Sequence, residues 1–104
     1  MTPNWNRTFR IIIQELLRYL IERPDAKDTM EGILKWWLPE AYVRQGREEI
    51  QRVIDFLVSR GWVVERTIAS SEKIYSVNQD RLQELQAFLE DLQKGTETGE
   101  GNDQ

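Results

Sequence analysis

The side chains of this chain that could do chemistry are cations, carboxylates, amides and hydroxyls, because the sequence contains no histidine and no cysteine. The usual general base, the commonest metal ligand and the thiolate nucleophile are therefore missing. A zinc site would have to use carboxylates alone. We accordingly expect a protein that is not an enzyme and that needs no cofactor and no metal.

The residue types that remain suit contact with DNA. Gln51 and Arg52 are adjacent and belong to the types that read base edges in the major groove. Further candidates for phosphate contact are Lys27, Lys35, Arg44, Arg47, Arg66 and Lys73. Glu48 and Asp55 oppose this interpretation, because each would face a row of phosphate charges. The segment 47–61 is thus either a nucleic-acid surface or a solvated or protein-binding face.

Carboxylates also accompany the two later cations. Glu65 precedes Arg66, and Glu72 precedes Lys73, at the two sides of a predicted hairpin tip. The cations could reach phosphate oxygens there. The alternative is that glutamates and cations pair across the strands on a solvent face.

Hydrophobic periodicity predicts the elements that hold these residues. They are a helix over 6–22, a helix from Asp28 to about 37 or 38, a helix over 47–61, a two-stranded hairpin over 62–68 and 73–77, and a helix over 79–94. A turn over 40–46 joins the second helix to the third. Asp28 is the predicted cap of the second helix, Gly61 ends the third in a left-handed conformation, and Asn78 or Asp80 caps the last.

This order of elements resembles a winged helix-turn-helix domain. The run 49–63 is similar to helix three of many bacterial regulators with the strand that follows, and 74–78 resembles the returning strand of the wing. The resemblance covers about residues 8–94, and 47–77 carries most of it. It implies a mainly α fold with a small β-hairpin, namely a three-helix core plus a wing and a C-terminal helix.

The resemblance also implies a function. In such regulators, of which the MarR-like and PadR-like groups are examples, helix three enters the major groove, the wing touches phosphate and the terminal helices form a dimer. The chain is then expected to be a DNA-binding transcriptional regulator and a homodimer. Its nucleic-acid-binding residues would be Arg44, Arg47, Gln51, Arg52, Arg66 and Lys73.

The alternative function is a winged-helix module that binds a protein and not DNA. Trp36 falls at the edge of the buried face of its helix, and exposed tryptophans often mark protein interfaces. Ile11 lies outside the apolar arc of the first helix, whereas Trp37 and Trp62 are expected in the core. A dimer seam would add Leu85, Phe88 and Leu92, which could equally pack on the first helix of the same chain.

Length and charge limit the remaining possibilities. The 104 residues fit one domain over 1–94, followed by an acidic tail over 95–104 that we expect to be disordered. The net charge is −4, and leaving out Glu97, Glu100 and Asp103 brings it to −1, which is not the basic excess of a dedicated nucleic-acid binder. No segment suits a membrane span or a secretory signal, so we expect a cytoplasmic protein without membrane contact.

Overall fold

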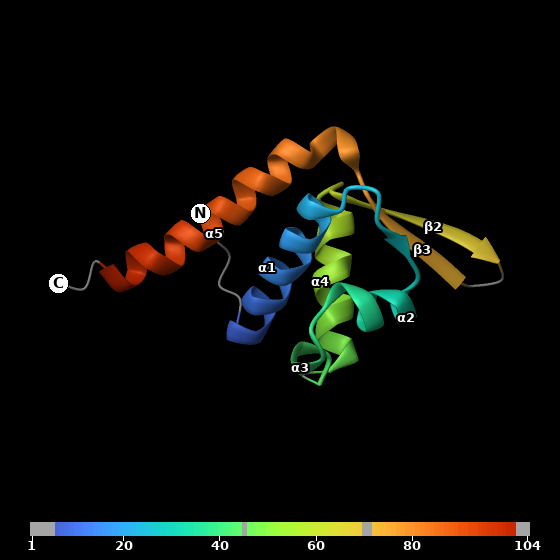
Figure 1. Ribbon diagram of the computed structural model, residues 1–104, viewed down its shortest axis with the longest axis horizontal. Coiled ribbons are helices and arrows are strands. Elements are labelled where there is room, and N and C mark those ends of the chain that lie inside the picture. Colours follow the sequence, from blue (N-terminus) through green and yellow to red (C-terminus); the bar gives the residue numbers. More distant parts are fainter. Residues whose placement is uncertain (1–5, 45, 70–71, 102–104) are drawn as a thin grey trace.

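The computed structural model describes residues 6–44, 46–69 and 72–101, and it describes side chains as far as Lys94. This part of the chain is mainly helical with a small three-stranded antiparallel sheet, which confirms the predicted mixture of helices and a small β-structure (Figure 1). The elements are α1 (Arg7–Glu22), β1 (Lys27–Asp28), α2 (Met30–Gly32), the π-helix η1 (Ile33–Trp37), α3 (Glu40–Val43), α4 (Arg47–Ser59), β2 (Val63–Ala69), β3 (Glu72–Val77), the 3₁₀-helix η2 (Gln79–Arg81) and α5 (Leu82–Gly101).

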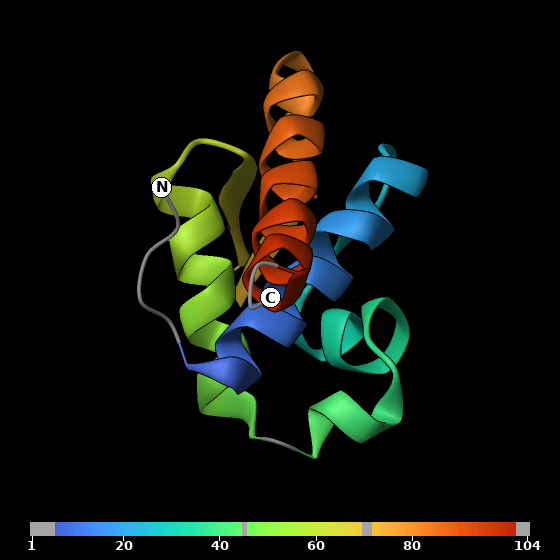
Figure 2. The same cartoon turned by 90° about the vertical axis from the view of Figure 1, so that its left-hand side faces the viewer.

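Helix α1 forms the centre of the core. Its first turn is capped by Asn6, whose Oδ1 accepts the N–H of Phe9 at 2.8 Å. The buried side chains are those that the periodicity predicts: Phe9, Ile12, Ile13, Leu16, Leu17 and Leu20. This face packs against α4 and α5, and α5 lies across α1 in both views (Figures 1 and 2).

The second helical segment begins one residue later than predicted. Thr29 is the cap, because its Oγ1 accepts the N–H of Gly32 at 3.3 Å. Asp28 belongs to β1 instead, and its Oδ1 accepts the N–H of Thr29 at 3.1 Å. The predicted turn over 40–46 contains the short helix α3, and Pro39, whose ring fixes its φ, is the N-cap of this helix.

The sheet has one strand more than the sequence predicts. Strand β1 pairs with β3 through Lys27↔Ser76 and Asp28↔Tyr75, and the strand order is β1-β3-β2. Two residues show no alternation, so the sequence alone could not predict this strand. The β2–β3 hairpin projects away from the helices (Figure 1).

The base of the hairpin is fixed by two capping residues that the sequence predicts, one before β2 and one after β3. Gly61 has φ of 78°, as a left-handed C-terminal cap of α4 requires, and β2 begins at Val63, one residue after the predicted start at Trp62. Asn78 follows β3 and caps η2, since its Oδ1 accepts the N–H of Asp80 at 3.1 Å. Its Nδ2 also donates to the Gly61 carbonyl at 2.8 Å. The two strands therefore leave and rejoin the helices at one point.

Helix α5 runs past the predicted end at residue 94 and continues to Gly101. A glycine inside a helix costs only about 1 kcal/mol relative to alanine, so Gly95 does not end the helix by itself. The side chains of 95–101 and the whole of 102–104 lie outside the described residues. The disordered tail stays a prediction.

Candidate interaction surfaces

The outward face of α4 holds the predicted base-reading residues. Ile50, Val53, Ile54 and Leu57 are buried, so the opposite side of the helix turns to solvent as predicted. Gln51 donates from Nε2 to Oδ1 of Asp55 at 3.0 Å, and Nη1 of Arg52 lies 2.8 Å from Oε1 of Glu49. Both candidates are thus already engaged by carboxylates of their own helix.

The same pairing extends to other predicted cations. Arg47 Nη2 lies 2.7 Å from Glu31 Oε2, and Arg44 Nη2 lies 3.8 Å from Glu40 Oε2. Within the described ranges, Arg66 is the exception among the predicted nucleic-acid-binding cations, since no carboxylate pairs with it. Surface pairs of this kind contribute about 0–1 kcal/mol each, so they matter here for local charge and little for stability.

Lys73 belongs to this paired set as well. Its Nζ lies 2.9 Å from Glu65 Oε2 on the neighbouring strand. The hydrogen bond to this carboxylate, together with its negative charge, raises the pKa of Lys73 above the usual 10.5. The cross-strand glutamate–lysine pairing that the sequence left open is therefore present.

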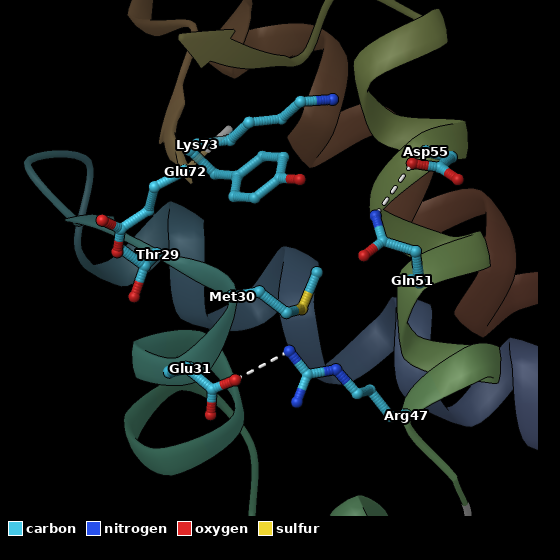
Figure 3. Close-up of a pocket in the computed structure, with 9 residues that line it drawn as sticks. Thr29, Met30, Glu31, Arg47, Gln51, Asp55, Glu72 and Lys73 are labelled. Carbon is cyan, nitrogen blue, oxygen red and sulfur yellow. Dashed lines mark hydrogen bonds and ion pairs between the residues drawn. The ribbon is translucent and has the colours of Figure 1, made fainter. Parts of the chain in front are cut away.

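A groove of about 580 Å³ separates α4 from the hairpin and from the start of α2. We call it the α4 groove; it is lined by Thr29, Met30, Glu31, Arg47, Gln51, Asp55, Glu72, Lys73 and Tyr75. Figure 3 shows Arg47 reaching across it to Glu31, and Gln51 turned toward Asp55. Three carboxylates against two cations give this groove a net charge of −1.

The opposite side of the hairpin has a different character. Side chains that alternate along β2 turn outward there, and Val64 and Ile68 are 38% and 50% exposed. Register places Arg66 opposite Ile74, while Val64 and Lys27 both lie opposite Ser76. We call this surface the outer hairpin face: Lys27, Val64, Arg66, Ile68, Ile74 and Ser76. Neither of its two cations pairs with a carboxylate in the part of the chain that the structure describes.

The predicted protein-contact residues of the helices divide into those with exposed surface and those that are fully buried. Trp36 is 67% exposed, whereas its neighbour Trp37 is 3% exposed and stacks on Tyr19 with 5.3 Å between ring centroids. Ile11 and Phe88 are half-buried. The sequence thus placed Trp36 correctly at an edge and Trp37 in the core.

The leucines of the last helix belong to the second group. Leu85 and Leu92 are both 0% exposed and join the core cluster that includes the buried face of α1. The contact between the first and last helices is therefore made within one chain. Leu85 and Leu92 have no surface to offer to a second copy.

The sequence did not single out Val64 and Ile68. The signal was the alternation of Val64, Arg66 and Ile68, which marks one face of a strand. The sequence does not show which face of the strand is exposed. The structure shows it, because the opposite face of the hairpin lies toward α4.

Comparisons with family models, with curated proteins and with solved structures found no match to this chain. The described residues contain no helix that could cross a membrane and no cluster of side chains that could hold a metal ion.

Proposed function

We propose that this chain is a winged-helix domain that binds a protein partner rather than DNA. The order of three helical segments, a projecting hairpin and a closing helix supports the winged-helix assignment. In that arrangement α4 corresponds to the helix that would enter a groove of DNA, and the hairpin corresponds to the wing.

The observation that carries the proposal is the charge on the surface that DNA would have to meet. The α4 groove has a net charge of −1, and Gln51, Arg47 and Lys73 within it are each engaged by a carboxylate. DNA-binding surfaces gain affinity by neutralising phosphates with unopposed cations. The cations could turn away from their weak surface pairs, but the carboxylates would remain beside the phosphates.

Exposed apolar side chains favour a protein partner. Trp36, Val64 and Ile68 are the large hydrophobic residues that stand out from the described surface. The buried centres of protein interfaces are more apolar than the rest of the surface, and aromatic residues and arginine are enriched there. The outer hairpin face combines exposed aliphatic side chains with two cations that pair with no carboxylate among the described residues.

The test compares two sets of variants in two assays. Val64→Glu with Ile68→Glu disrupts the outer hairpin face, and Glu48→Lys is the matched control on the exposed side of α4. We expect no saturable binding of duplex DNA at about 50 mM salt. A partner captured from lysate of the source cells should be lost with the hairpin variant and retained with the control.

Two results would contradict the proposal. One is saturable DNA binding by the unaltered chain that weakens steeply as salt is raised. The other is capture of the partner by the hairpin variant as efficiently as by the unaltered chain. Circular dichroism of both variants distinguishes loss of binding from loss of folding.

A further inference from the structure

The hairpin ends the sheet with an open edge. Because the strand order is β1-β3-β2, strand β2 has a hydrogen-bonded neighbour on one side only. It is 7 residues long and projects beyond the helices (Figure 1). A strand edge of this kind presents unpaired N–H and C=O groups to which another extended chain can add.

The register shows which backbone groups face outward. Asn78 donates its N–H to the carbonyl of Trp62 at 2.8 Å, so the hydrogen-bonded pairs begin there. Antiparallel pairs alternate between hydrogen-bonded and non-hydrogen-bonded, and Val64 and Arg66 therefore bond to β3. The backbone groups of Glu65 and Thr67 point toward the open edge.

The side chains next to this edge define what an added strand should carry. Val64, Arg66 and Ile68 follow one another on the outer hairpin face, and Arg66 has no carboxylate partner within the described ranges. We propose that the open edge of β2 binds an extended segment of a partner protein with a carboxylate between two apolar side chains at alternate positions. The apolar side chains of the partner would then lie opposite Val64 and Ile68, and its carboxylate would lie opposite Arg66.

Charge disfavours a second copy of this chain as the occupant. A twofold axis perpendicular to the sheet would pair β2 with itself about one central residue. The register with the longest overlap centres on Arg66, the middle residue of β2, and sets two guanidinium groups opposite each other. Centring on Glu65 sets two carboxylates opposite each other, and both arrangements are destabilising. Helix α5 runs away from the hairpin as far as Gly101, so these residues do not lie at the edge either (Figure 1).

The experiment uses the full chain and a fluorescein-labelled peptide, TITETVT, followed by fluorescence anisotropy. This inference rests on the proposed function, because it names the partner chemistry of the outer hairpin face. We expect saturable binding that Arg66→Glu weakens roughly tenfold, while Arg52→Glu on α4 changes it by less than about twofold. A peptide with lysine in place of glutamate should show the reverse preference and bind Arg66→Glu more tightly.

Backbone pairing is tested with N-methylated peptides. Methylation of the amides that would face β2 should abolish binding, and methylation of the alternate amides should leave it unchanged. The inference is overturned by absence of saturable binding, by equal effects of Arg66→Glu and Arg52→Glu, or by indifference to the position of methylation. Sedimentation of the unaltered chain as a dimer that Arg66→Glu alters would also overturn it, since the edge would then hold a second copy.

The two proposals fail in different ways. If the peptide does not bind but capture of the partner still depends on Val64 and Ile68, the edge assignment alone is wrong. If the unaltered chain binds DNA and captures no partner, the protein-binding function itself is wrong.

Discussion

Gly32 and Asp28 provide a sharp test of how the second helical segment is anchored to the sheet. Gly32 has ordinary helical angles, with φ of −67° and ψ of −37°, so alanine fits its backbone without strain. A Cβ built on Gly32 would, however, overlap the carboxylate of Asp28. That carboxylate accepts the N–H of Thr29 at 3.1 Å, next to the start of α2.

Two opposing effects set the size of the change in Gly32→Ala. Alanine favours a helix over glycine by about 1 kcal/mol. To make room for the methyl group, the Asp28 carboxylate must move. We expect this movement to break its hydrogen bond with the Thr29 N–H. A hydrogen bond to a charged group contributes about 1.5–3 kcal/mol. We therefore expect Gly32→Ala to lower the free energy of unfolding by about 0.5–2 kcal/mol, although propensity alone predicts an increase.

The assay is urea denaturation followed by tryptophan fluorescence, since Trp37 and Trp62 are buried and change environment on unfolding. A double-mutant cycle with Asp28→Ala isolates the overlap. In the Asp28→Ala background, Gly32→Ala should raise the free energy of unfolding by up to about 1 kcal/mol. A gain of stability from Gly32→Ala with Asp28 intact, or a coupling below about 0.5 kcal/mol, would refute the reasoning.

Three further perturbations test the core and the hairpin. Trp37→Ala should cost about 3–5 kcal/mol because the side chain is buried, while Trp36→Ala should change stability by less than about 0.5 kcal/mol; urea titration of the pair compares them. Leu92→Ala should lower the free energy of unfolding by about 2–5 kcal/mol. Unchanged stability together with loss of a dimer in sedimentation would contradict the burial of Leu92 in the core of one chain. Lys73 has a raised pKa, so its pairing contributes at lower pH and is lost as pH rises through that pKa, above 10.5. Glu65→Gln should return the pKa of Lys73 toward 10.5, and an unchanged side-chain NMR titration would show that Glu65 is not the cause.

Local periodicity was sufficient for the long helices. The buried faces of α1 and α4 repeat at helical spacing, and each is confirmed. Gly61 and Asn78 were also predictable, because a left-handed cap and an N-cap require particular residue types. These features depend on residues only a few positions apart, so the sequence contains the necessary information.

Strand β1 and the cap of α2 were decided at longer range. Asp28 and Thr29 are both good caps, and their types do not distinguish them. Pairing of Asp28 with Tyr75 across the sheet draws Asp28 into a strand and leaves Thr29 to cap. Only the folded chain brings these two segments together.

The same division applies to the candidate surfaces. The sequence by itself determined which residue types are present, that histidine and cysteine chemistry is excluded, and that acids and bases are mixed along α4. It could suggest the Arg52–Glu49 pair, which lies one helical turn apart, but not the Arg47–Glu31 pair, which joins α4 to α2. Tertiary structure alone decided that the α4 groove is slightly negative and that Lys27 and Ile74 join Arg66 on one face, because net charge and exposure depend on which distant segments become neighbours.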